Sequence, residues 1–299
     1  MSEGFHVRSP STGSRSPRGW RLVALGLVAA LTLAGCAELG APENGFLPSR
    51  PGLTDKTESM INHWNGAWLA ALAVAVLVWG LIIWCVIAYR KRKNDNALPV
   101  QLRYHIPLEL MYTVVPILMI GVLYFYAVQV TDDFTDTSAE PDLQIQAYGK
   151  QWSRDFNYLT DGVYYEGGRV QLTGEEGVEG TLPTLYLPVG ETVEFIVDSR
   201  DVIHSFWIPA FLFKIDMIPG KTNVFEVTPQ EIGTYQGKCA ELCGEFHSEM
   251  LFNVEVVDRA TYDAEMEALR EAGFVGERGA EYNRVYDQRG YLQDGTGNN

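Results

Sequence analysis

The stretch Cys239-Ala240-Glu241-Leu242-Cys243-Gly244-Glu245-Phe246-His247-Ser248-Glu249-Met250 places two thiols, an imidazole and a thioether within one short segment. Thiolate and thioether sulfur are soft ligands that suit copper, and imidazole suits copper as well. A blue-copper loop needs only one cysteine, whereas two thiolates four residues apart can each bridge a pair of copper ions. His204, between two apolar runs upstream, can supply a second imidazole. The stretch therefore predicts a binuclear copper site.

Three other interpretations of these residues compete with copper. Cysteines four residues apart can form a disulfide outside the cytoplasm, although a disulfide leaves the spacing of His247 and Met250 unexplained. Two cysteines and two histidines can bind zinc tetrahedrally, but zinc has no use for Met250. A chance match is the third interpretation. We favour copper because it uses every donor in the segment.

Short alternating segments surround this loop. They occupy residues 143–148, 185–190, 192–197, 224–227, 233–235 and 252–256, with Gly, Pro and Asp between them. Alternation of apolar and polar residues is typical of half-buried strands, and several short strands with turn residues between them favour a β-sandwich or barrel. We expect residues 142–258 to form a cupredoxin-like Greek-key domain, with the metal loop between its last two strands.

Two apolar segments precede this domain, at about 67–89 and 107–130. Each is long enough to cross a membrane as a helix, so residues 61–132 predict a transmembrane hairpin and a membrane α+β fold class. The first segment ends in Arg90-Lys91-Arg92-Lys93, and basic clusters stay on the cytoplasmic side. The acidic domain and both mature termini are then expected on the outer face.

The ends of the chain have compositions of their own. Four arginines precede a short apolar run that ends in Leu33-Ala34-Gly35-Cys36, which predicts a signal peptide over 1–35 with Cys36 acylated as in bacterial lipoproteins. An ordinary signal peptide cut nearby is the alternative. Residues 36–60 are interpreted as a tether. Residues 259–299 are interpreted as a helix over 261–271, ended by Gly273, followed by a polar tail.

The chain has 299 residues and a net charge of −15. An acidic exposed domain favours a basic protein partner through electrostatic steering, although acidity also serves solubility alone. We expect no nucleic-acid partner.

The sequence resembles subunit II of haem-copper cytochrome c oxidases along nearly all of the mature chain. The resemblance implies that His204 and His247 each bind one copper of a CuA centre and that Cys239 and Cys243 bridge both ions. It also implies that Met250 is a weak ligand and that Glu241 offers its backbone carbonyl. The Glu241 carboxylate would reach a magnesium or manganese ion shared with subunit I.

The resemblance further implies a function. The chain would accept single electrons from a c-type cytochrome and relay them to haem a in subunit I of an aa3-type oxidase. There, with CuB, oxygen is reduced to water and protons are pumped across a bacterial plasma membrane. Subunits I and III and lipid would be its partners, and this chain alone would reduce no oxygen. Asp201, Asp216 and the acidic loop 175–179 could form the face toward the cytochrome.

Two further positions match the family. Trp152 matches the tryptophan that receives the electron, although the family continues with aromatic residues where this chain has Ser153 and Arg154. This departure motivates the hypothesis of a tethered or complex-bound cytochrome donor. Glu109 matches a glutamate that feeds a proton channel in subunit I, although Tyr112 stands where the family usually has tryptophan.

Three rival functions remain. A quinol oxidase subunit II shares the two spans and the outer sandwich but lacks the copper ligands. A membrane-tethered copper carrier without a redox relay would need neither the Glu241 carboxylate nor Glu109. A nitrous-oxide reductase shares the copper motif but needs a large further domain. The cytochrome oxidase interpretation fits the residues best.

Overall fold

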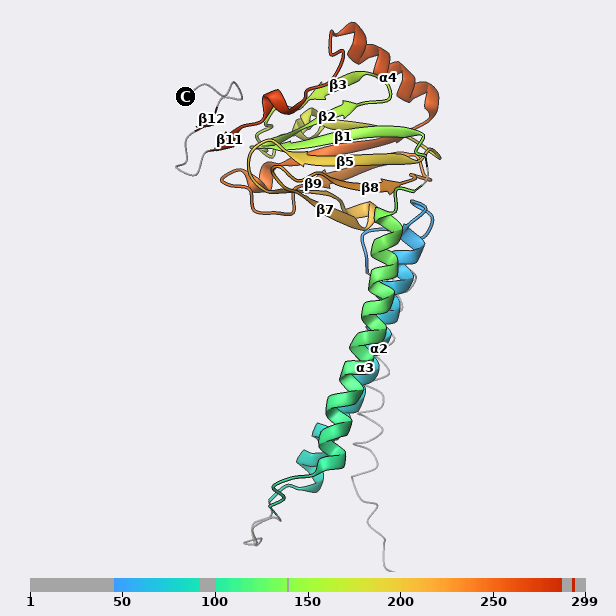
Figure 1. The fold of residues 1–299 in the computed structure, drawn as a ribbon, viewed down its shortest axis with the longest axis vertical. Helices are drawn as coiled ribbons and strands as arrows, with labels where there is room; N and C mark the ends of the chain where they lie inside the picture. Colours follow the sequence, from blue (N-terminus) through green and yellow to red (C-terminus); the bar gives the residue numbers. More distant parts are fainter. Residues whose placement is uncertain (1–45, 92–100, 139, 287–291, 294–299) are drawn as a thin grey trace, which may run out of the picture. The chain divides into compact units, whose positions relative to one another are not determined.

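Two long helices lead into a domain built of β-sheets (Figure 1). The computed structural model describes residues 46–91, 101–138, 140–286 and 292–293. The expected signal peptide and its Cys36 lie outside the described residues, as does most of the last part of the chain after Tyr286.

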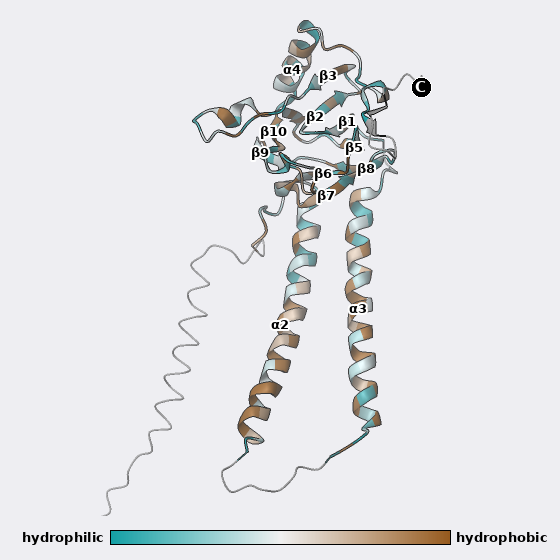
Figure 2. Cartoon of the chain, turned by 90° about the vertical axis from the view of Figure 1, so that its left-hand side faces the viewer, coloured by the Kyte–Doolittle hydropathy of each residue, from teal (hydrophilic) through white to brown (hydrophobic). Residues whose placement is uncertain are grey.

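The helices α2 (Thr57–Ala88) and α3 (Ile106–Thr135) are both long and apolar enough to cross a membrane. Figure 2 shows hydrophobic residues along much of their length. The membrane-length windows are not buried against any other described part of the chain. Both helices reach beyond the expected apolar segments: α2 begins earlier than residue 67, and α3 ends later than residue 130. The additional turns carry polar residues, so hydropathy alone does not mark them.

The first turn of α3 is fixed by a reciprocal cap. The backbone N–H of Leu108 donates to His105 Nδ1 at 3.2 Å, and the backbone N–H of His105 donates to Glu109 Oε1 at 2.9 Å. Each side chain thus satisfies a donor that the helix start would otherwise leave free. Glu109 therefore has a structural role at this helix end.

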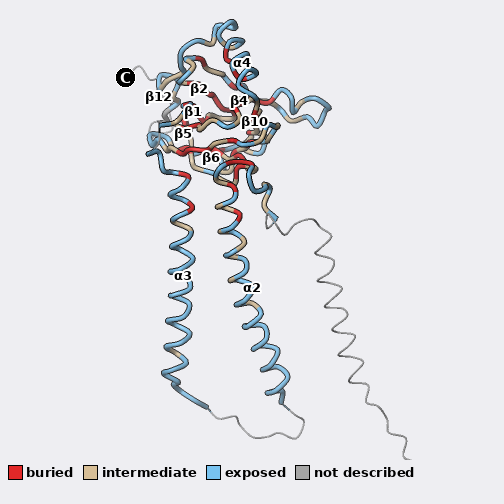
Figure 3. Tube along the Cα trace, turned by 90° about the vertical axis from the view of Figure 1, so that its right-hand side faces the viewer, coloured by how far each residue is buried: buried red, intermediate tan, exposed pale blue. Residues whose placement is uncertain are grey.

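The other ends of the helices contact the sheet domain. The ring of Phe134 stacks on Phe213 with centroids 4.4 Å apart. Lys56 Nζ pairs with Asp133 Oδ1 at 3.1 Å and so joins the start of α2 to the last turns of α3. Figure 3 shows that the buried residues of α2 and α3 lie at these ends only. The helix ends are thus packed, whereas the apolar windows present their side chains outward.

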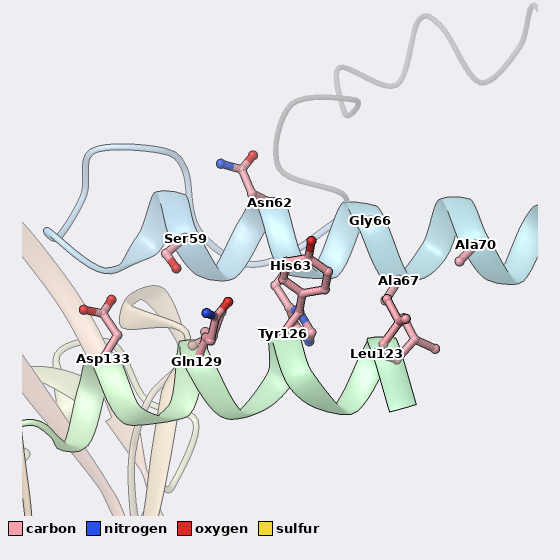
Figure 4. A pocket seen from close by; sticks show the side chains of 12 residues that line it. Ser59, Asn62, His63, Gly66, Ala67, Ala70, Leu123, Tyr126, Gln129 and Asp133 are labelled. Carbon is pink, nitrogen blue, oxygen red and sulfur yellow. The ribbon is translucent and has the colours of Figure 1, made fainter. Parts of the chain in front are cut away.

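A cavity of about 740 Å³ lies between the two helices near the same ends (Figure 4). Small residues of α2 form one wall, among them Gly66, Ala67 and Ala70. His63, Gln129 and other polar groups lie at its rim, nearer the sheet domain. The helices therefore diverge around a space with an apolar base and a polar rim.

Two five-stranded sheets make up the outer domain, with strand orders β3-β2-β1-β5-β8 and β4-β10-β9-β6-β7. Each sheet holds one parallel pair, β1 with β5 and β4 with β10, and its other pairs are antiparallel. The expected membrane α+β fold, with two apolar helices and a cupredoxin-like β-sandwich, is confirmed. The first sheet comprises β1 (Leu143–Lys150), β2 (Ser153–Tyr158), β3 (Val163–Glu166), β5 (Val193–Ser199) and β8 (Asn223–Val227). The second comprises β4 (Thr184–Pro188), β6 (His204–Ile208), β7 (Phe213–Met217), β9 (Gly233–Lys238) and β10 (Leu251–Val257).

The core between the sheets is rich in aromatic rings. Phe206 contacts Phe195, Phe225 and Phe252 with centroids 5.3–5.9 Å apart. Along β5 and β10 every second residue is buried, as the strand period requires. Each such side chain adds about 1.5–3 kcal/mol when it is fully buried. The core thus fixes the strands from which the metal loop departs.

Four strands of the sandwich were not expected from the sequence: β2, β3, β6 and β7. All six residues of β2 are buried, including Arg154, Asp155 and Asn157. A strand that is buried on both faces and carries polar residues shows no alternation, so hydropathy does not reveal it.

A helix and an extended segment follow the sandwich. In α4 (Arg259–Glu271) the Asp258 side chain caps the start by accepting from the Thr261 N–H at 3.0 Å, and Tyr262 and Met266 are buried. The segment 274–284 then runs along β2 and β3. Its Phe274 O accepts from Tyr164 N at 3.0 Å, and Arg278 O accepts from Arg200 Nη2 at 2.8 Å. A short pair, β11 (Val285–Tyr286) and β12 (Leu292–Gln293), ends the described chain.

Candidate metal centre

The loop between β9 and β10 closes on itself. The backbone N–H of Cys239 donates to Met250 O at 3.1 Å, so the two ends of the segment meet. Gly244 has φ +125°, and a Cβ there would lie 3.2 Å from the Trp152 ring and 3.1 Å from Gln151. A side chain at this position would be strained and crowded. The glycine therefore allows the loop to turn against the first sheet.

Five donor atoms converge inside this loop. Cys239 Sγ lies 3.9 Å from Cys243 Sγ and 4.0 Å from His204 Nδ1. Cys243 Sγ lies 3.5 Å from His247 Nδ1 and 3.7 Å from Met250 Sδ. Cys239, Cys243 and Met250 are buried together, and Trp152 packs against them. The loop and the start of β6 thus bring together two sulfurs, two ring nitrogens and a thioether.

Asp201 determines how His204 presents its ring. Its Oδ1 lies 2.8 Å from His204 Nε2 and accepts from the Val202 N–H at 2.7 Å, and its Oδ2 accepts from the Gln151 N–H at 2.8 Å. The carboxylate accepts a hydrogen bond from Nε2–H and leaves Nδ1 facing Cys239, which is the arrangement a metal-binding histidine needs. Gly149 makes room for the ring, because a Cβ there would lie 2.9 Å from His204 Cδ2.

The buried charges of this pair support each other. Burial lowers the pKa of His204, but the Asp201 carboxylate and the Cys239 sulfur outweigh burial, so the pKa lies above its ordinary value. Burial alone would raise the pKa of Asp201, and the hydrogen bonds from His204, Gln151 and Val202 lower it. Asp201 was predicted to lie on a face toward a cytochrome. That prediction was wrong, because the carboxylate is buried and bonded to the ligand histidine.

The two cysteine sulfurs are free thiols that act on each other. The hydrogen bond from Cys243 lowers the pKa of Cys239, and the same contact raises the pKa of Cys243. Cys239 is therefore the sulfur that ionises first, while Cys243 keeps its proton. A metal ion that binds both thiolates takes the place of that proton.

The remaining candidate residues lie at different depths. Glu241 is exposed, and its backbone oxygen accepts from Cys239 Sγ at 3.2 Å. Trp152 is half-buried and meets Phe246 edge-on, with centroids 4.9 Å apart. Glu109 caps α3 and takes no part in the cluster. Cys36 lies outside the described residues.

Two residues of the site were missed from the sequence. Gln151 donates from Nε2 to Cys243 O at 2.9 Å and so connects the metal loop to the turn between β1 and β2. Arg154 is buried behind the cluster. The contact of Asp201 with His204 could have been predicted from the sequence. An aspartate three residues before a histidine is close enough to accept a hydrogen bond from its ring.

The donor set suits copper. Two thiolates 3.9 Å apart can each reach the same ions, because half of that separation is shorter than a metal–thiolate bond of about 2.3 Å. The thioether favours a soft metal over zinc. His204, Cys239 and Cys243 keep their donor atoms within 4.8 Å of one another. The residues therefore fit a binuclear copper centre.

Comparison with known proteins decides the family. The family model "Cytochrome C oxidase subunit II, periplasmic domain" matches residues 143–257. The chain is 40% identical over 301 residues to the "Probable cytochrome c oxidase subunit 2" of Streptomyces coelicolor, covering 90% of this chain and 93% of that one. The chain belongs to the cytochrome c oxidase subunit II family.

Two further proteins are similar to this subunit II. The "Cytochrome c oxidase subunit 2" of Mycobacterium tuberculosis is 35% identical over 305 residues, covering 83% of this chain and 82% of that one. The periplasmic domain of subunit II of cytochrome oxidase from Bradyrhizobium japonicum is 30% identical, with a TM-score of 0.42 over 46% of this chain and 99% of that chain. This subunit II is thus a membrane-anchored oxidase subunit with a cupredoxin-like domain and two helices long and apolar enough to span a membrane.

Proposed function

We propose that the chain accepts single electrons from a c-type cytochrome at a CuA centre and relays them to haem a in subunit I. With CuB, subunit I would reduce oxygen to water and pump protons. The observation that carries the proposal is the convergence of both sulfurs with His204 Nδ1, His247 Nδ1 and Met250 Sδ. A copper pair bound there supplies storage and transfer of one electron.

The chain's own residues would hold this centre rigidly. Cys239 and Cys243 would bridge the ions, His204 and His247 would each bind one, and Met250 Sδ and the Glu241 carbonyl would be weak ligands. Asp201 fixes the His204 ring, and Gln151 fixes the Cys243 backbone. When the donor atoms of a metal site are already fixed by the protein, the site rearranges little as the charge of the metal changes. Fast electron transfer requires such a small rearrangement.

Trp152 is proposed as the residue through which the electron arrives. Its indole packs on Cys239, Cys243 and Met250 and meets Phe246 edge-on. Gly244 and Phe246, around it, belong to the loop, and Arg169 covers the Phe246 ring at 3.8 Å. The indole therefore contacts both the loop and the sulfur cluster. A donor held in a complex is proposed because Ser153 and Arg154 replace the usual aromatic residues.

The contact with the other subunits is proposed to lie around Glu241. Its carboxylate is exposed while its backbone carbonyl faces Cys239, so one residue could join the copper site to a magnesium or manganese ion at subunit I. Subunit III is proposed as a further partner. Glu109 is proposed at the entrance of a proton channel, in addition to its capping contact.

The proposed location is a bacterial plasma membrane, with α2 and α3 as spans. The sheet domain and both mature termini would lie on the outer face, because the basic cluster that begins at Arg90 favours the cytoplasm. Acylation of Cys36 is proposed from its lipobox. The boundaries at residues 35, 60, 132, 142 and 258 are proposed for the signal peptide, tether, hairpin and outer domain.

The experiment is metal analysis and EPR spectroscopy of the oxidase purified from membranes. We expect two copper ions in this subunit and a mixed-valence signal, with one electron shared over two copper nuclei. Cys243→Ser should remove that signal, whereas Cys85→Ser, in α2, should keep it. A single-copper signal or stoichiometric zinc would refute the proposal, and a single-copper signal would favour a copper carrier without a redox relay.

A further inference from the structure

A second buried charge lies behind the sulfur cluster. Arg154, in β2, is 1% exposed and is among the largest fully buried side chains. Its Nη2 donates to Ser205 O at 2.7 Å, and its Nη1 donates to Met217 Sδ at 2.9 Å. Its guanidinium lies over the Phe252 ring at 4.8 Å. The charge is therefore enclosed by the core between the two sheets.

These contacts join Arg154 to the ligand strand. Ser205 follows His204 in β6, and Met217 of β7 is the cross-strand neighbour of His204. The guanidinium thus holds the backbone next to one metal ligand and the side chain opposite it. An arginine that donates hydrogen bonds to two adjacent strands restricts the movement of both strands.

No carboxylate pairs with Arg154 in the described part of the chain. The neighbouring Asp155 pairs instead with Arg200 at 2.8 Å and with Lys150 at 2.6 Å. A buried cation without a counter-charge is strongly unfavourable. The Cys239 and Cys243 sulfurs act on Arg154 from the metal loop, and arginine does not lose its proton in proteins. The guanidinium therefore stays charged at neutral pH.

We propose that Arg154 is a positioning residue that favours the reduced state of the metal centre through its fixed positive charge. The inference rests on the proposed function. An electron that arrives at the centre lowers the local positive charge by one, and a nearby cation stabilises that change. Arg154 also holds β6, so that His204 keeps its place in both charge states.

The expected size follows from the charge. At an effective dielectric constant of about 20, a unit charge within roughly 12 Å of a redox centre changes its reduction equilibrium on the order of tenfold or more, and Arg154 lies next to the Cys239 sulfur. Removal of the Arg154 charge should therefore make reduction about tenfold less favourable. For a one-electron couple, tenfold corresponds to about 59 mV.

The test compares Arg154→Lys with Arg154→Gln in the purified oxidase. Both side chains can donate to Ser205 O, but only lysine is charged. The reduction potential of the copper centre is measured by redox titration followed by its absorption and EPR signals, with copper content measured in parallel. Phe252→Leu is the packing control, since it removes the ring below the guanidinium and keeps the charge. Arg154→Met takes the place of Arg154→Gln if the latter does not bind copper.

We expect the glutamine variant to have a potential lower by about 59 mV, and the lysine and leucine variants to stay near the wild type. Loss of copper from Arg154→Gln and Arg154→Met, but not from Arg154→Lys, would also support the need for a charge. An unchanged potential in the glutamine variant, an equal shift in the lysine variant, or loss of copper from all three would overturn the inference. A wild type without a two-copper signal would instead overturn the proposed function.

Discussion

Replacement of Asp201 by asparagine tests whether one buried carboxylate organises the ligand His204. Asp201 accepts hydrogen bonds from three N–H groups, those of His204 Nε2, Val202 and Gln151, at 2.7–2.8 Å. An amide of the same size has one acceptor oxygen and one NH₂ donor. Asp201→Asn therefore sets donor against donor at one of these contacts at least.

The size of the effect follows from these bonds. A hydrogen bond to a charged group contributes about 1.5–3 kcal/mol, so the metal-free outer domain should lose about that much unfolding free energy. Loss of the partner that orients a metal-binding histidine lowers metal affinity about 10- to 100-fold. The copper affinity of Asp201→Asn should fall within that range.

The assay is a competition titration of copper between the purified full-length chain in detergent and a chelator of known affinity. Asp198→Asn is the matched control, because Asp198 accepts from Thr222 and Gln146 and touches no donor atom of the metal site. The reasoning fails if Asp201→Asn binds copper as tightly as the wild type. It also fails if Asp198→Asn loses as much affinity.

Three other substitutions give separate outcomes. Glu226 faces Glu194 across β5 and β8, and burial followed by that like charge raises its pKa; Glu226→Gln should therefore raise the melting temperature at pH 7. A raised carboxyl pKa destabilises the folded state only at a pH where the carboxyl group is ionised. The gain in melting temperature should therefore vanish as the pH falls below 4.5, the ordinary pKa of the group. A gain that persists at lower pH would contradict the raised pKa of Glu226. Leu185→Ala should cost about 2–5 kcal/mol in denaturant unfolding because the side chain is fully buried, with the copper spectrum unchanged once the protein is folded. Arg200→Gln should lower the free energy of unfolding by about 1–3 kcal/mol, because the hydrogen bonds to the carbonyls of residues 278 and 279 are lost. Limited proteolysis should also cut segment 274–284 faster than in the wild type.

The sequence pointed to the side chains that converge in the metal loop because their chemistry is rare and their spacing is short. It also predicted the strands with clear alternation, such as those near residues 143–148 and 252–256. It did not predict β2, whose six residues are all buried and include a charged pair of neighbours, Arg154 and Asp155. Partners for such residues come from distant segments, Ser205 and Arg200 among them. Hydropathy along the chain contains no information about those partners.

The role of Asp201 was missed for a related reason. An exposed acidic residue and a buried one look alike in a sequence, and only the turn before β6 brings this carboxylate back to the His204 ring. The early start of α2 was missed because its first turns are largely polar, and the two buried residues of this helix, Thr57 and Ile61, lie within them. Local composition describes the membrane window well and the helix ends poorly.

The position of segment 274–284 has a consequence for biosynthesis. Arg200 donates to the carbonyls of Arg278 and Gly279, and the Arg284 N–H donates back to the carbonyl of Arg200, next to Asp201. Ribosomes make these residues after every ligand of the metal site. The turn that carries His204 therefore acquires the support of segment 274–284 only after the whole metal loop has been made, so copper delivered after this segment has docked would meet a braced histidine.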